Sequence, residues 1–388
     1  MPALRRVVPW LLALALITLW LSSLPPVARY ATDTRYYHVA AQRVALHQTP
    51  YVKAGGYIYP PFLAQALTLL PLEKTAFSSI WNALLALSVL VTIALATRAA
   101  RLPPLLVAAS FALLWTEPVR WGLRLGNASH LVTGILALAA ASFWSLPLLA
   151  GVLIGIAAAI KIVPGVFLAW CAGAYLRARD RQYLIAGLSG FATLAVTLLH
   201  RDTLAFLHAA HGETQLRLVL GTNFSLFSEL ERATGIAVPG VVGPPLGAAA
   251  AFALGLRQRP GRDAALTAFG LVQLLALLSS PVAWSHLFVL AFWPALVASG
   301  SILRDPLRLH DPRRWQLQGL TAVMVFCILS RVKLFYLPDH VWGSVVFPLG
   351  PLIAVFLIGA RLLKCNEPEL HPASPDPAHP VYAASSRS

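Results

Sequence analysis

The chain alternates between long apolar runs and short polar segments. The apolar runs cover residues 7–24, 77–96, 105–115, 130–143, 148–160, 163–176, 183–199, 238–256, 266–278, 287–302, 316–334 and 345–362. They lack the period-2 alternation of a membrane β-barrel, and a chain in lipid must satisfy its backbone hydrogen bonds internally. The pattern therefore predicts an all-α, polytopic transmembrane helix bundle of about 12 spans.

A polar stretch at residues 30–62 separates the first apolar run from the second. Residues 33–47 have helical spacing but are too polar to cross a bilayer, so we expect a helix along the membrane surface with Thr32 or Asp33 as its N-cap. Pro and Gly residues then break the chain, and residues 62–70 are long enough only for a second interfacial or re-entrant helix. The segment 200–235 is expected to form a second long polar loop.

The composition agrees with a membrane protein. The 388 residues are 58% hydrophobic and 12% charged, with a mean hydropathy of +0.70. The 30 Lys and Arg against 15 Asp and Glu give a formal net charge of +15. In such a chain basic residues collect in cytoplasmic loops and at anionic membrane lipids, and we expect no nucleic-acid partner because no aromatic-basic platform is visible.

The basic residues also predict an orientation. Arg5 and Arg6 precede the first run, which we interpret as an uncleaved anchor, and they place the N-terminus in the cytoplasm. Asp33 then lies outside, in a multi-pass protein of the cytoplasmic (inner) membrane with its polar clusters on the external face. Residues 1–364 are predicted to form one integral membrane domain. Residues 365–388, rich in Pro and Ser, are predicted to be a disordered cytoplasmic tail.

The polar residues of the predicted external side indicate one class of chemistry. Asp33 is the first acidic residue of the chain and Glu73 is the next, whereas cations and aromatic residues are abundant nearby. One carboxylate suffices where a phosphate departs as an anion, because only the attacking hydroxyl then needs a base. Lys and Arg would hold the phosphate, and a polyprenyl chain would lie between helices. No DxD or HExxH motif is present, so we expect neither a metal nor a cofactor.

Several motifs resemble glycosyltransferase family 87, the polyprenol-phosphate-mannose-dependent mannosyltransferases of the GT-C superfamily. In chain order they are DTRYYHVAAQRVALHQTPYVKAGGYIYPP, LGNASHLV, AAAIKIVPGVFL, TNFSLFSELER and SSPVAWSHLFVL. The resemblance covers about residues 33–294. The chain departs from the family pattern in lacking a Gln beside Asn127 and in having Ser285 where relatives often carry an acid. These departures concern the identity of the acceptor.

The resemblance implies a GT-C fold and an inverting transfer of a hexose, mannose above all, from a polyprenyl-phosphate donor to a lipid or glycan acceptor. Asp33 would be the general base, and His286 would contact the donor phosphate or the acceptor. The other candidates for binding the donor phosphate or substrate are Lys161, Arg217, Arg124, Asn127, Asn223 and Tyr59.

Other interpretations remain open at this point. Asp33 could only cap a helix, Lys161 could extend to the membrane surface, and His286 could be structural. Arg124 and Arg217 could contact headgroups, and Tyr57 and Tyr59 could belong to an interfacial aromatic belt. As whole proteins, a lipid or sugar transporter and a non-catalytic scaffold are the alternatives. Convergence of Asp33, Lys161 and His286 on one cavity would argue against the scaffold.

Overall fold

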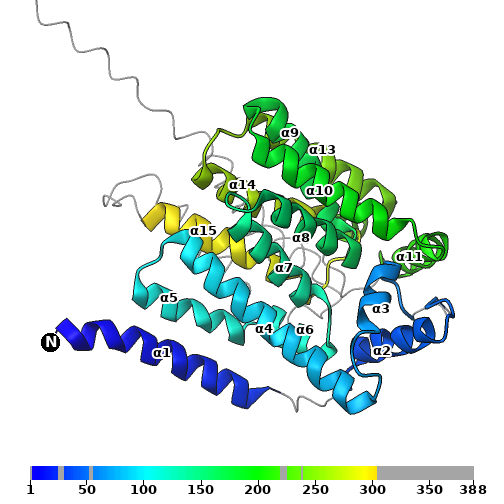
Figure 1. Ribbon diagram of the computed structural model, residues 1–388, viewed down its shortest axis with the longest axis horizontal. Coiled ribbons are helices and arrows are strands. Elements are labelled where there is room, and N and C mark those ends of the chain that lie inside the picture. Colours follow the sequence, from blue (N-terminus) through cyan, green and yellow to red (C-terminus); the bar gives the residue numbers. More distant parts are fainter. Residues whose placement is uncertain (1, 25–29, 52–55, 219–224, 237–238, 304–388) are drawn as a thin grey trace, which may run out of the picture.

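The structure is a computed structural model that describes residues 2–24, 30–51, 56–218, 225–236 and 239–303. Over these residues the chain is a bundle of helices, with no strand in the described part (Figure 1). The all-α prediction is therefore confirmed there. The apolar runs at 316–334 and 345–362, and the predicted tail, lie outside the described residues.

The first half of the bundle runs from the N-terminal helix to the helix that begins within the LGNASHLV motif. Its elements are α1 (Pro2–Ser23), α2 (Thr32–Ala45), α3 (Pro61–Leu67), α4 (Lys74–Ala100), α5 (Pro104–Ser110), the 3-10 helix η1 (Phe111–Trp115), α6 (Glu117–Leu125) and α7 (Ser129–Ser142). The long helix α4 packs against α7 and α15, while α1 lies along α5 (Figure 1).

The second half stacks its helices beside α7. Its elements are α8 (Pro147–Ile160), η2 (Val163–Gly165), α9 (Val166–Ala178), α10 (Arg181–Leu198), α11 (Thr203–Leu218), α12 (Leu226–Thr234), η3 (Gly240–Val242), α13 (Gly243–Arg257), α14 (Arg262–Ser279), η4 (Ser285–Ala291) and α15 (Phe292–Leu303). The largest contacts are α9 with α13 and α8 with α10. Glycine permits the first of these, since a Cβ on Gly173 would stand 2.2 Å from the Phe252 carbonyl oxygen.

Three helical segments of the described part are long and apolar enough to cross a bilayer. They are Lys74–Ala100, Gly240–Arg257 and Arg262–Ser279, and a fourth results if Arg181–Leu198 and Thr203–Gly212, which meet at 91°, form one span. The other apolar segments have 10–17 residues, with α1 counted over Val7–Ser23. Apolar helices in this number identify a membrane protein. The count of about 12 spans stays a prediction.

Two local predictions, the polar loop at 200–235 and the N-cap of α2, were wrong, and two further details were not predicted. The expected polar loop at 200–235 instead contains α11 and α12, because short helices form wherever a polar segment can pack one apolar side. The apolar run at 287–302 begins as the 3-10 helix η4, and α6 was not foreseen. The N-cap of α2 is Ala31, without a side-chain cap, so neither Thr32 nor Asp33 fills that role.

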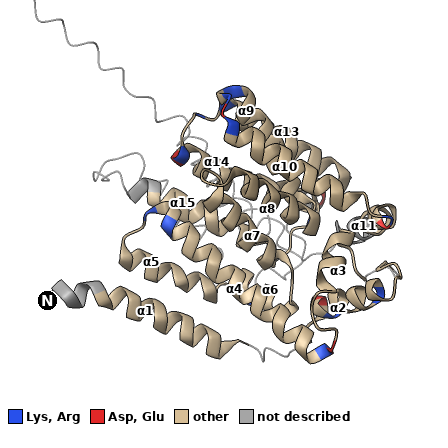
Figure 2. Ribbon diagram, in the orientation of Figure 1, with Lys and Arg blue, Asp and Glu red and all other residues tan. Residues whose placement is uncertain are grey.

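The two ends of the bundle differ in charge. Figure 2 shows Lys and Arg gathered where α4 and α9 end and where α14 begins. Arg101 follows α4, and its guanidinium lies 3.5 Å from the Asp263 carboxylate of α14. The end of α4 and the start of α14 therefore lie at the same end of the bundle. The opposite end carries α2, α3 and the starts of α4 and α9. Asp33 lies at this second end, in the first turn of α2.

Candidate active site

Helix α2 is held against the bundle by aromatic side chains. Tyr37 is fully buried, and its ring lies 5.2 Å from both the Tyr59 and the Trp81 rings in edge-to-face arrangements. The Ala128 backbone N–H donates to Tyr37 Oη at 3.2 Å, and Trp81 Nε1 donates to the Gly126 carbonyl at 2.8 Å. The residues just before α7 are therefore fixed by side chains from α2 and α4.

A tight turn between α6 and α7 places Asn127. Gly126 ends α6 in the left-handed conformation, with φ of +71°, and the Asn127 N–H donates to the Gly122 carbonyl at 2.9 Å. This is the geometry of a glycine-terminated helix. The Asn127 side chain is 1% exposed. The turn thus presents a buried amide to the first turn of α2.

A helix break places Lys161. The backbone of Lys161 is extended, with φ of −136°, directly after α8 ends at Ile160. Pro164 explains the break, because a helical proline would clash with the carbonyl four residues earlier, at Ile160, and could donate it no hydrogen bond. The Lys161 side chain leaves the helix axis here and meets α7.

Hydrogen bonds connect the Asp33 carboxylate to the Lys161 ammonium. Asn127 Nδ2 donates to Asp33 Oδ2 at 2.6 Å and to Tyr59 Oη at 3.1 Å. Lys161 Nζ donates to Ser129 Oγ at 2.7 Å and lies 3.4 Å from Asn127 Oδ1. The Ser129 hydroxyl also donates to Asn127 Oδ1, at 2.6 Å. A carboxylate, an amide and an ammonium group from three distant segments therefore form one network.

A cavity of about 170 Å³ opens beside this network. Its polar lining comes from Tyr59, Asn127, Ser129, Lys161, Ser280, Trp284 and His286. The rest of the wall is mostly apolar, with contributions from α7, the α8–α9 break, α11 and η4. Asp33 is outside the lining but one hydrogen bond away through Asn127. The cavity combines a cation and polar groups with an apolar wall.

His286 and Trp284 form the far side of this cavity. His286 is 1% exposed, at the start of η4, and its ring lies edge-on to Trp284 with centroids 5.6 Å apart. Lys161 and His286 thus line one cavity, and Asp33 adjoins it. The predicted convergence of all three residues on one cavity is therefore met by two of them, and Asp33 is connected to it through Asn127.

The other predicted site residues lie elsewhere or are not described. Arg124 is exposed on α6, with its guanidinium 5.6 Å from the Trp121 ring centroid, and does not line the cavity. Arg217 belongs to α11, but its side chain is outside the description, and Asn223 lies outside the described residues. Tyr57 is 5% exposed and donates from Oη to the Pro60 carbonyl at 2.8 Å, so it shapes the loop and is not part of a surface belt.

Two residues of the network were not singled out from the sequence. Ser129 joins Lys161 to Asn127, and Tyr37 anchors the backbone beside them. A signal for Ser129 was present, since a Ser two positions after an Asn, at the start of a helix, can bond that Asn. The role of Tyr37 depends on residues about 90 positions away, and no local pattern indicates it.

Electrostatics favour a charged, anion-attracting site at neutral pH. Burial lowers the pKa of the Lys161 ammonium to about 8, and the nearby Asp33 carboxylate opposes that shift. Asp33 lies in the first turn of α2, where the helix dipole favours negative charge. Among the described residues no group of three or more His, Cys, Asp or Glu side chains could hold a metal ion.

No curated protein matches the chain. The model of glycosyltransferase family 87 matches residues 57–281, which is more than half of the chain. The match contains Tyr59, Asn127 and Lys161, whereas Asp33 and His286 lie outside it. On the strength of this match, the chain belongs to glycosyltransferase family 87.

Proposed function

We propose that this membrane protein is an inverting glycosyltransferase that moves a hexose, most simply mannose, from a polyprenyl-phosphate carrier to a lipid or glycan hydroxyl. The observation that carries the proposal is the hydrogen-bond network from Asp33 through Asn127 to Lys161, beside a cavity with an apolar wall. Family membership supports the transferase. The donor, the acceptor and the external location of the site belong to the proposal.

The network suits such a reaction step by step. The Asp33 carboxylate takes the proton from the acceptor hydroxyl as its oxygen attacks the anomeric carbon. The bond from that carbon to the phosphate oxygen breaks on the opposite face, and the phosphate leaves as an anion beside Lys161. The configuration at the anomeric carbon is therefore inverted. No general acid is needed, because the leaving phosphate requires no proton.

The remaining residues have supporting roles in the proposal. Asn127 donates to Asp33 and so orients the carboxylate, while Ser129 holds the Lys161 ammonium at the cavity. His286 is placed to contact the phosphate or the sugar across the cavity. The apolar residues Val132, Ile162 and Leu290 suit the first isoprene units of the carrier.

The test is a transfer assay with purified full-length protein, short-chain polyprenyl-phosphate-mannose and membrane lipid extract. Asp33→Asn is expected to reduce turnover by about 10²–10⁴-fold, the usual contribution of a general base, without losing donor binding. Asp263→Asn makes the same change at an exposed position in the opposite end of the bundle and should behave as wild type. Near-normal turnover by Asp33→Asn would overturn the assignment of the base.

A parallel reaction with polyprenyl-phosphate-glucose tests the sugar. The proposal expects mannose to be transferred in preference, and equal or better transfer of glucose would correct the donor while leaving the base assignment intact. Donor binding without transfer by any variant, combined with donor movement across vesicle membranes, would favour the transporter instead.

A further inference from the structure

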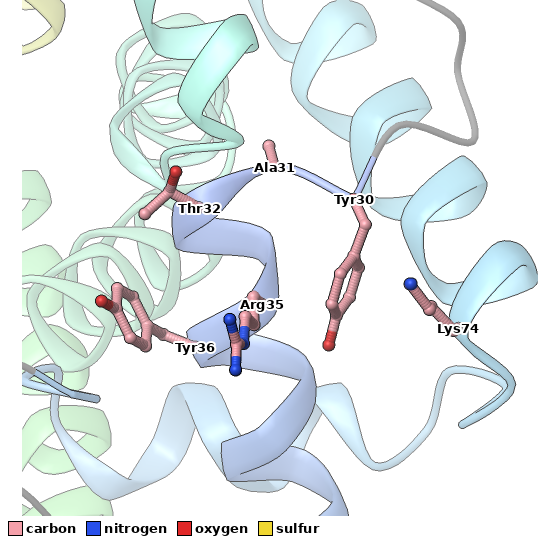
Figure 3. Close-up of a pocket in the computed structure, with 6 residues that line it drawn as sticks. All are labelled: Tyr30, Ala31, Thr32, Arg35, Tyr36 and Lys74. Atoms are coloured by element: carbon pink, nitrogen blue, oxygen red, sulfur yellow. The ribbon is translucent and has the colours of Figure 1, made fainter.

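A second pocket, of about 480 Å³, lies on the outer side of α2. Its lining residues are Tyr30, Ala31, Thr32, Arg35, Tyr36 and Lys74. The two cations come from different helices, α2 and α4, and no acidic residue is among the lining residues (Figure 3). The nearby Glu73 is the N-cap of α4, where its carboxylate accepts hydrogen bonds from the Thr75 and Ala76 backbone N–H groups at 2.8 and 2.7 Å.

Buried groups hold this pocket in shape. His38 is 4% exposed, and its Nε2 lies 2.9 Å from the Leu72 carbonyl, so Nε2 carries the proton and Nδ1 accepts. Tyr30 Oη donates to that Nδ1 at 2.8 Å. The Lys74 ammonium in turn lies over the Tyr30 ring, 4.6 Å from its centroid, in a cation–π contact. A buried imidazole thus positions one wall of the pocket and, through it, one of the two cations.

The pocket adjoins the proposed base. Thr32, Arg35 and Tyr36 share one face of α2 by their i, i+3 and i+4 spacing, and Asp33 stands at the edge of the neighbouring face, which also carries Tyr37. Asp33 therefore lies between the cavity of Lys161 and His286 on one side and the pocket of Arg35 and Lys74 on the other. An inverting transfer needs its two substrates on opposite sides of the reacting carbon, with the acceptor hydroxyl at the base.

The Lys161 cavity and the outer pocket differ in the chemistry of their lining residues, as the donor and the acceptor of such a transfer differ in theirs. The Lys161 cavity has an apolar wall and suits a phosphate on a hydrocarbon chain. The outer pocket has a larger polar share in its lining, with exposed Arg35 and Lys74 and the partly exposed rings of Tyr30 and Tyr36. Figure 3 shows Tyr30 between Lys74 and Arg35, with Tyr36 beyond Arg35. Guanidinium and ammonium groups beside aromatic rings suit a phosphorylated sugar, because the cations bind phosphate and sugar rings stack on tyrosine.

We propose that the pocket of Tyr30, Arg35, Tyr36 and Lys74 binds the acceptor, and that the acceptor is a phosphate-bearing glycan or glycolipid. This rests on the proposed glycosyl transfer. The phosphate contacts the Arg35 and Lys74 side chains, which flank the Tyr30 ring (Figure 3), the sugar lies along the tyrosines, and the accepting hydroxyl reaches Asp33 over the edge of α2. A neutral glycan lacks the group that the two cations recognise.

Equilibrium binding tests the pocket without requiring turnover. The probes are octyl mannoside and octyl mannoside phosphate, measured by isothermal titration with the full-length protein in phosphatidylcholine nanodiscs. The phosphorylated probe is expected to bind wild type about tenfold or more tightly than the neutral one, the effect of a charged hydrogen bond. Arg35→Gln and Lys74→Gln should each remove much of that preference, and the double variant should bring the two probes to near parity.

Matched controls separate the pocket from general charge and from the donor. Arg177→Gln removes one exposed cation at the other end of the bundle and should keep the preference. Lys161→Gln should weaken binding of a short prenyl phosphodiester while leaving the mannoside phosphate unaffected. Equal binding of both mannosides by wild type, or a preference that survives the double variant, would overturn the proposal. Loss of prenyl phosphodiester binding in Arg35→Gln or Lys74→Gln would also overturn it, by making the pocket a donor site.

A lipid headgroup is the other source of the same phosphate chemistry. Nanodiscs of phosphatidylglycerol distinguish it, since full competition by this lipid against the mannoside phosphate would identify a headgroup site and overturn the acceptor assignment. Retained preference in both lipids supports the acceptor. Failure of Asp33→Asn to alter transfer leaves these binding results unchanged, so the two proposals fail separately.

Discussion

At the scale of single residues, the site depends on groups that have several partners at once. Asn127 donates to Asp33 and Tyr59 through one amide nitrogen and accepts at its oxygen from Ser129 and Lys161. Such shared hydrogen bonds orient each member and keep buried polar atoms satisfied. The Asn127 amide carries no charge, so it connects the Asp33 carboxylate to the Lys161 ammonium without repelling either group.

The lysine of this network predicts a pH dependence of donor binding. The pKa of Lys161 is lowered from its usual 10.5 to about 8, so the ammonium is charged below pH 8 and loses its charge above it. If only the charged form binds phosphate, affinity should fall about tenfold between pH 7 and pH 9. A prenyl phosphodiester is the suitable probe, because a phosphomonoester itself titrates near pH 6.

The control for this dependence is Lys161→Gln, which should bind the phosphodiester weakly and equally at both pH values. An unchanged pH profile in Lys161→Gln would show that another group titrates, and flat binding by wild type would contradict the role of the ammonium.

At the scale of elements, helix ends make the site. Asn127 follows the glycine that ends α6, Lys161 follows the break of α8, and Asp33 lies in the first turn of α2. Helix termini leave backbone groups unpaired and allow conformations that a helix interior forbids. Packing of α2 against the α6–α7 turn brings these ends together.

Gly126→Ala tests this packing. Its left-handed backbone costs an alanine about 1–2 kcal/mol, and the added Cβ would stand 1.9 Å from Thr34 Oγ1 in the first turns of α2. The substitution should therefore lower the midpoint of thermal unfolding and displace Asp33, with activity reduced at least tenfold.

Gly212→Ala is the matched variant, because a Cβ there meets nothing within 4 Å and its φ is not positive. It should keep wild-type activity and thermal midpoint, both measured by the transfer assay and by scanning fluorimetry. Wild-type behaviour of Gly126→Ala would mean that α2 tolerates a shift against the turn.

At the scale of the whole molecule, the basic ends of α4 and α9 and the candidate site lie at opposite ends of the bundle (Figure 2). Arg98 lies in the last turn of α4 and Arg101 follows the helix, whereas Lys74 begins it at the end that carries the site. Basic residues concentrate on the cytoplasmic side of membrane proteins, so we expect the site to face outward.

Cysteine labelling in intact cells measures this orientation. In a protein whose Cys171, Cys327 and Cys365 are replaced by alanine, Gln48→Cys should react with a membrane-impermeant maleimide from outside. Arg177→Cys, at the basic end, should react only after permeabilisation. The reverse pattern would place the site in the cytoplasm and contradict the proposed location.

The sequence by itself determined the class of the molecule and the identity of its main polar residues. Apolar runs without a period-2 pattern require helices in a membrane, and the isolation of Asp33 in the chain marked it as a candidate. These inferences need only local composition and spacing. The predicted helices near 33–47 and on both sides of Lys161 are accordingly present.

Only the tertiary structure decided which candidates meet. Asp33, Asn127 and Lys161 share a network, whereas Arg124 projects from α6 to the surface, and nothing local in the sequence distinguishes these cases. The same holds for Ser129, and for the pairing of Arg35 with Lys74 across two helices. The reason is physical, because such contacts depend on how helix ends pack across long separations, while sequence patterns report mainly which side of each helix is apolar.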